Sequence, residues 1–96
     1  MTQRQKLPNR RGAEICTLQH EGHQYRCTFG TFPDGTLGEI FLDTGKPNAP
    51  LQAQADDAGV LCSLLLQHHV EPDVIRRSVA GPIRAALDLW LARLHP

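Results

Sequence analysis

The first third of the chain alternates apolar and polar positions, a pattern typical of strands with one buried face. It predicts strands over residues 14–20 and 23–29, joined by the two-residue turn Glu21-Gly22. So short a turn fixes which residues face each other. The register places these pairs opposite each other: His20 and His23, Leu18 and Tyr25, Cys16 and Cys27. With Phe29 they form the face that we expect to point into the core, although the two histidines lie beside the turn, where solvent reaches them.

A third strand is predicted over residues 37–42, after the turn signal Pro33-Asp34-Gly35. The next eight residues, 43–50, contain two prolines and a glycine and cannot continue it. A long helix follows, with apolar positions spaced by three and four residues. Its predicted stripe is Leu51, Ala55, Ala58, Cys62, Leu65 and His69. Residues 58–66 are apolar almost all round, which predicts burial on several sides, and Gly59 indicates a close backbone contact.

Two further helices complete the predicted fold. Pro72 at a first helical position begins a short helix that ends near Val79. The last helix carries one apolar stripe of Ile83, Leu87, Trp90 and Leu94. The sequence therefore predicts an α+β fold, in which a three-stranded antiparallel β-meander precedes a long buried helix, a short helix and a C-terminal helix. Residues 13–96 are expected to form a single domain, and residues 1–12 a flexible basic tail.

Composition narrows the classes of partner. Of 96 residues, ten are basic and ten acidic, and this zero net charge argues against broad electrostatic binding to nucleic acid or to a membrane. No apolar run is long enough to span a bilayer, so no membrane role is expected. The three cysteines include no CxxC pair, which favours reduced thiols and a cytoplasmic protein. The charge is uneven, because four basic residues precede the first acidic one: Arg4, Lys6, Arg10 and Arg11.

The cysteines and histidines raise the question of a metal or a catalytic site. His20 and His23 flank the hairpin turn, but ligands spread along two strands are too far apart for four of them to reach one zinc ion. Cys62 lies in an apolar helix, where burial raises a thiol's pKa and lowers its reactivity. No GxSxG motif occurs. We therefore expect no metal, no cofactor and no catalytic residue, and whether the chain belongs to an enzyme stays open.

The loop before the long helix is the candidate ligand site. Free N–H groups at the start of a helix attract anions, and a lysine there adds a positive charge. The candidate residues are Thr44, Gly45, Lys46 and Asn48, with a nucleotide or phosphate as the ligand. The segment is not a P-loop, because the leading glycine and the Ser/Thr after the lysine are missing.

The last helix is the candidate interface. Its stripe is widened by Ala86 and Leu91 beyond what one neighbour needs, and a surplus of apolar surface usually marks a contact with another chain. The candidate interface residues are Leu87, Trp90, Leu91 and Leu94. They predict a homodimer or a protein partner, against the alternative that this helix closes the core of a monomer.

Four strings of the sequence together resemble the TSCPD domain family. They are RRGAEICTLQHEGHQYRCTFGTF, DGTLGEIFLDTGK, SLLLQHHV and EPDVIRRSVAGPIRAALDLWL, which span roughly residues 10–92. The family occurs at the C-terminus of adenosylcobalamin-dependent ribonucleotide reductases and in short stand-alone bacterial proteins. The chain departs from it at Asn48-Ala49, where the family usually has Gly-Ser, and it lacks the cysteine motif behind the family name. The resemblance implies a link with deoxynucleotide synthesis, and it places no catalytic residue on this chain.

Three functions remain open at this point. The first is a non-catalytic accessory or ligand-binding module related to ribonucleotide reductase. The second is a small protein-interaction or inhibitor protein, and the third is nucleic-acid binding through the basic tail. Salt-dependent binding to RNA or DNA would indicate the third, and nucleotide-dependent thermal stabilisation the first. Co-purification with a protein in the absence of nucleotide would indicate the second.

Overall fold

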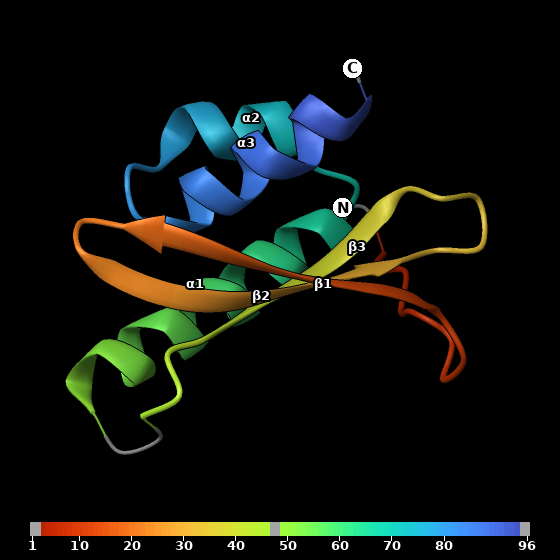
Figure 1. Ribbon diagram of the computed structural model, residues 1–96. Coiled ribbons are helices and arrows are strands. Elements are labelled where there is room, and N and C mark those ends of the chain that lie inside the picture. Colours follow the sequence, from red (N-terminus) through yellow and green to blue (C-terminus); the bar gives the residue numbers. More distant parts are fainter. Residues whose placement is uncertain (1–2, 47–48, 95–96) are drawn as a thin grey trace.

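The computed structural model describes residues 3–46 and 49–94, the last of these by its backbone alone. Figure 1 shows the antiparallel sheet, in the order β1-β2-β3, and the three helices that follow it. The elements are β1 (Gly12–His20), β2 (His23–Thr31), β3 (Leu37–Asp43), α1 (Pro50–Gln67), α2 (Pro72–Ser78) and α3 (Pro82–Leu94). This confirms the predicted α+β fold and the order of its elements.

The hairpin of β1 and β2 has the predicted register. Cys16 pairs with Cys27, and His20 pairs with His23 next to the turn. Glu21 and Gly22 both have positive φ, 50° and 80°, which is the geometry of the tight turns that match the twist of a hairpin. Each of these two strands is two residues longer than predicted, because pairing continues after the apolar alternation ends.

The core lies between one face of the sheet and the helices. Leu18, Tyr25, Cys27 and Phe29 are buried as predicted, while Cys16 is only partly buried. Figure 1 shows α2 and α3 together on one side of the sheet, and Trp90 of α3 contacts Phe29 with ring centroids 5.3 Å apart. The opposite face of the sheet leaves Ile15 and Phe41 exposed.

Helix α1 corrects the predicted pattern of burial. Leu61 is 63% exposed, Val60 51% and Leu65 44%, so the prediction of burial on several sides is wrong. The buried residues are Gln52, Ala55, Gly59, Cys62, Ser63, Leu66 and Gln67. Four of these seven are polar or glycine, because α1 lies along β3 and faces the strand's backbone as well as the core. The close contact predicted for Gly59 is confirmed, since a Cβ there would lie 3.0 Å from the carbonyl oxygen of Ile40.

The segment before β1 contains no helix or strand over its described residues, 3–11, but it contacts the domain. The backbone N–H of Gln5 donates to the carbonyl of Gln67 at 2.7 Å. Arg4 donates to the side chain of Gln67 at 2.6 Å, and Arg11 to Glu39 at 2.5 Å. Two of the four basic residues of this segment thus bind groups of the same chain. The flexibility of the segment stays a prediction.

Candidate functional site

The candidate anion loop uses its own N–H groups. The backbone N–H and hydroxyl of Thr44 both donate to the side-chain oxygen of Gln52 at 2.7 Å. The N–H of Gly45 donates to Asp43 at 2.8 Å, and the N–H of Lys46 to the Thr44 hydroxyl at 3.2 Å. Asn48, the fourth predicted residue, lies outside the described residues. The three amides that an anion would bind are therefore already donating to side chains of the loop and of α1.

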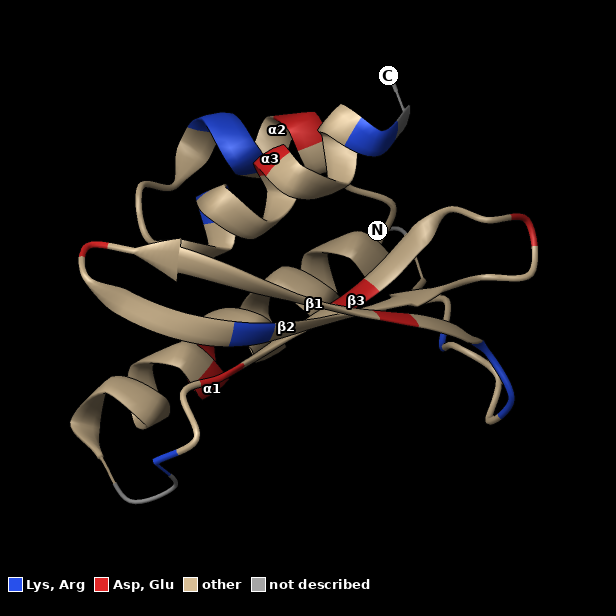
Figure 2. Ribbon diagram, viewed as in Figure 1, with Lys and Arg blue, Asp and Glu red and all other residues tan. Residues whose placement is uncertain are grey.

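The charges around this loop also differ from those of an anion site. Asp43 ends β3 next to the loop, and Gln52 donates its amide to Asp56 at 2.7 Å. Lys46 is exposed, and the residue that caps α1, Ala49, has no side chain that can accept a hydrogen bond. Figure 2 shows basic and acidic positions close together around the loop before α1. An anion here would displace internal hydrogen bonds close to two carboxylates.

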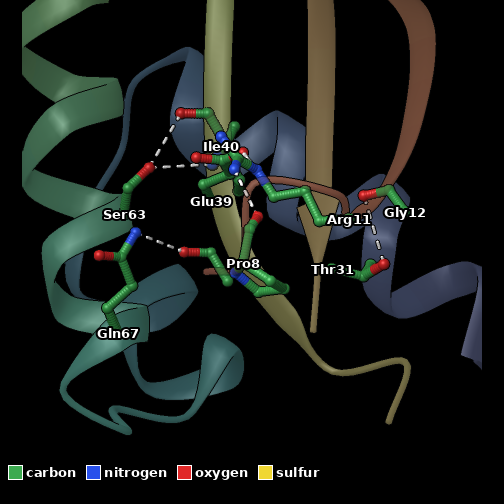
Figure 3. Close-up of polar contacts among 9 residues, drawn as sticks. Pro8, Arg11, Gly12, Thr31, Glu39, Ile40, Ser63 and Gln67 are labelled. Atoms are coloured by element: carbon green, nitrogen blue, oxygen red, sulfur yellow. Dashed lines mark hydrogen bonds and ion pairs between the residues drawn. The ribbon is translucent and has the colours of Figure 1, made fainter. Parts of the chain in front are cut away.

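A row of polar side chains on α1 instead binds the backbone of β3. We call Gln52, Ser63 and Gln67 the α1 polar row. The N–H of Ile40 donates to the Ser63 hydroxyl at 3.0 Å, and that hydroxyl lies 3.2 Å from the carbonyl of Ile40 (Figure 3). Gln67 donates to the carbonyl of Gly38 at 3.1 Å, and Gln52 to that of Leu42 at 3.2 Å. The row therefore provides hydrogen-bond partners for the outward N–H and carbonyl groups of β3, which is an edge strand of the sheet.

Sequence reasoning missed this row, although a signal for it exists. Gln52, Gly59, Ser63 and Gln67 recur at spacings of seven, four and four, so they share one face of the helix. Polar residues and a glycine on one face of an otherwise apolar helix indicate contact with backbone, because buried polar groups need hydrogen-bond partners.

The outward face of α1 carries the most exposed apolar group on a helix. We call Val60, Leu61 and Leu65 the α1 outer stripe. Leu61 and Leu65 are four residues apart and therefore adjacent on the helix surface. Large apolar side chains that gather on a surface mark contact sites more often than scattered ones do. Because α1 turns its polar row to β3, this stripe faces away from the sheet.

Two of the three cysteines, Cys27 and Cys62, are poor nucleophiles. Burial, together with the smaller effect of the neighbouring Cys16, raises the pKa of Cys27 to about 12. Burial also raises the pKa of Cys62 to about 11. Both thiols are therefore protonated at neutral pH, whereas the thiolate is the reactive form. Within residues 3–46 and 49–93, no three His, Cys, Asp or Glu side chains converge on a point where a metal ion would fit.

The candidate interface residues of α3 lie largely inside the chain. Leu87 has no exposed surface and Trp90 is 8% exposed. Leu91 is partly buried against the core, and the side chain of Leu94 lies outside the described residues. Leu87 and Trp90 thus offer no surface to a partner, because α3 covers the sheet that β1 and β2 form. The large apolar side chain that the described part of α3 does expose is Leu89, at 40%.

A cleft of about 580 Å³ lies between the turn after β2, the connection of α1 to α2, and α3. Its apolar wall includes Phe32, Leu66 and Trp90. Its rim is acidic, with Asp34 and Asp73 among the residues that line it. Hydrogen bonds from Thr36 lower the pKa of Asp34, and Arg76 lowers that of Asp73, so both carboxyls are ionised at neutral pH. The cleft is therefore unsuited to a phosphate.

Comparison with known proteins relates the chain to one large enzyme. It is 38% identical over 68 residues to the vitamin B12-dependent ribonucleotide reductase of Agrobacterium fabrum, which covers 71% of this chain and 5% of that protein. The reductase of Bradyrhizobium diazoefficiens is 33% identical over 91 residues, 88% of this chain and 7% of that protein. That of Rhodopirellula baltica is 29% identical over 72 residues, 75% of this chain and 7% of that protein.

This chain resembles one region of vitamin B12-dependent ribonucleotide reductase. It spans only 5–7% of the length of these curated relatives. No protein-family model matches the chain, and no solved structure matches it. No helix in the described part of the chain is long and apolar enough to cross a membrane.

Proposed function

We propose that the chain is a non-catalytic accessory module of the TSCPD type, which binds ribonucleotide reductase through the α1 outer stripe in the bacterial cytoplasm. The exposure of this stripe, with Leu61 63% exposed, is the observation that carries the proposal. The similarity to the reductase of Bradyrhizobium diazoefficiens covers 88% of the chain, so the whole domain resembles a piece of that enzyme. A domain that is part of a large protein has neighbours to pack against, and an exposed apolar helix face suits such a contact.

The contacts made by residues of the segments that resemble the TSCPD family support a structural role for those segments. In DGTLGEIFLDTGK, Asp34 accepts hydrogen bonds from Thr36 in the turn before β3, at 2.9 Å and 2.6 Å. Glu39 lies against Gly30 and pairs with Arg11. Asp43 closes the loop after β3 by accepting from Gly45. These residues shape β3 and its two turns, which fits a module that presents surfaces better than one that cradles a phosphate.

The experiment measures binding of the purified chain to the vitamin B12-dependent ribonucleotide reductase of its own organism by biolayer interferometry. Leu61→Lys is expected to weaken binding at least about tenfold, because it places a charge where the complex would bury an apolar side chain. Val74→Lys is the matched control, since Val74 is 43% exposed on α2, away from the stripe. Absence of binding, or equal weakening by both variants, would sink the proposal.

The same purified proteins can distinguish the other candidate functions. A rise in melting temperature with a deoxynucleotide that Lys46→Ala abolishes would indicate the ligand-binding version and the loop Thr44–Lys46. Loss of reductase activity on saturating binding would indicate an inhibitor. Binding to RNA or DNA that falls steeply with salt would indicate the basic tail. Figure 2 shows the basic residues scattered over several elements.

A further inference from the structure

No strand among the described residues pairs with the outer edge of β1. Ile40 directs its N–H and carbonyl to Ser63, away from β2, so Phe29 opposite it directs its own groups to β1. Phe29 pairs with Glu14, and the pattern alternates along the strand. The residues that direct their N–H and carbonyl groups outward are therefore Ala13, Ile15, Thr17 and Gln19. No side chain of the described residues hydrogen-bonds to these groups, in contrast to the edge of β3.

The edge of β1 also lacks the features that usually keep edge strands apart. Natural edges carry prolines, bulges or outward charges that prevent pairing with another strand. β1 has nine residues without proline, and its pairing with β2 continues without interruption. Its one charged residue, Glu14, is held by Arg93 of α3. The edge is therefore long and regular, and its one charged side chain is already paired within the chain.

Apolar surface lies beside this edge on both sides of the sheet. Ile15 is 61% exposed on the face that no helix covers. On the helical side, two grooves of about 450 and 410 Å³ run between β1 and α3, and Leu89 and Thr17 line both. A strand added to this edge would have Ile15 on one face and Leu89 on the other.

We propose that β1 pairs antiparallel with β1 of a second copy of this chain, so that two three-stranded sheets become one six-stranded sheet. A register centred on Cys16 uses the whole strand, with Ile15 opposite Thr17 and Ala13 opposite Gln19. Four such pairs exchange two bonds each, which gives about eight backbone hydrogen bonds between the copies.

Charge and shape favour a second copy in this register. No like charges face each other, because Glu14 lies opposite Leu18. Leu89, which lies beside Cys16 and Thr17, meets its own equivalent across the two-fold axis.

The first test is the mass in solution. The chain should sediment at about twice its mass of 10.7 kDa, and Thr17→Pro should reduce the mass to that of the monomer. The N–H that this proline removes points outward, so the hairpin keeps its own bonds. Leu89→Lys tests the same interface without changing the strand, and it should weaken the dimer at least about tenfold. Val74→Lys, of similar exposure, should leave the dimer unchanged.

The second test identifies the register. Cys16 faces its own equivalent in a non-hydrogen-bonded pair, where Cα atoms lie roughly 4.5 Å apart, within the range that a disulfide spans. In a Cys27→Ser variant, which lacks the thiol opposite Cys16 in the same chain, diamide takes up the two hydrogens of the Cys16 thiols and should give a covalent dimer that Cys16→Ser abolishes. A monomer at several hundred micromolar, or a dimer that resists Thr17→Pro and Leu89→Lys, overturns the proposal. These tests contain no reductase, so their result is independent of the proposed function.

Discussion

The two edge strands of the sheet meet different neighbours. Along β3, the α1 polar row accepts from or donates to the backbone of Gly38, Ile40 and Leu42. Along β1, the outward backbone groups meet no side chain in the described part of the chain, and α3 lies over the face of the strand instead of along its edge. The comparison shows how a helix can protect an edge: it must present polar side chains, and it must come close enough to use them.

Gly59 explains why α1 comes so close to β3. A Cβ at this position would lie 3.0 Å from the carbonyl oxygen of Ile40, so a larger residue would force the helix away. The missing side chain lets Ser63, four residues further on, reach both backbone groups of Ile40. The cost of a glycine in a helix, about 1 kcal/mol relative to alanine, is offset by these bonds.

The largest expected difference between the edges is in amide exchange. In dilute monomeric protein, the N–H of Ile40 should exchange about a thousandfold more slowly than that of Thr17, which corresponds to about 4 kcal/mol of protection. The N–H of Cys16 points to β2 and should be slow, although it is adjacent to Thr17. Exchange followed by NMR gives all three rates. Comparable rates at Ile40 and Thr17 would contradict the assignment of a capped and an open edge.

Preventing the close contact of α1 with β3 at Gly59 should destabilise the protein. Gly59→Leu should lower the free energy of unfolding by about 3 kcal/mol, because the new side chain meets backbone that cannot move out of its way. Ala53→Leu, at an exposed position of the same helix, should change it by less than about 0.5 kcal/mol. Urea unfolding followed by circular dichroism measures both values. Equal effects of the two substitutions would show that α1 does not depend on contact with β3 at this point.

Removing one member of the α1 polar row should have a smaller effect. Ser63→Ala leaves the buried N–H and carbonyl of Ile40 without their partner and should cost about 2 kcal/mol. Ser78→Ala removes a hydroxyl that donates to the carbonyl of Val74 in an exposed position and should cost less than about 0.5 kcal/mol. The same unfolding measurement compares them. If Ser63→Ala is as mild as its control, the edge of β3 is not held by this row.

The candidate site could be predicted from the sequence only in part. Thr44, Gly45 and Lys46 lie in a loop before α1 as expected, but their N–H groups are taken by Gln52, Asp43 and Thr44 itself. Local spacing shows where a loop begins, whereas the direction of its amides depends on side chains brought in by the fold. For the same reason the stripe on α3 was correctly predicted as apolar, yet the sequence did not show that Leu87 and Trp90 are buried within one chain.

The sequence by itself determined the hairpin and the order of the elements. The turn at Glu21-Gly22 sets the pairing of Cys16 with Cys27, because a two-residue connection allows one register and alternate side chains then share a face. Which face of α1 turns inward became clear only from the tertiary structure, although the spacing of its polar residues and glycine marks that face in the sequence. A helix that is apolar almost all round has no single hydrophobic face to bury, so the choice was made by the hydrogen bonds that Ser63 and its neighbours form with the edge of β3. That choice leaves Leu61 in solvent.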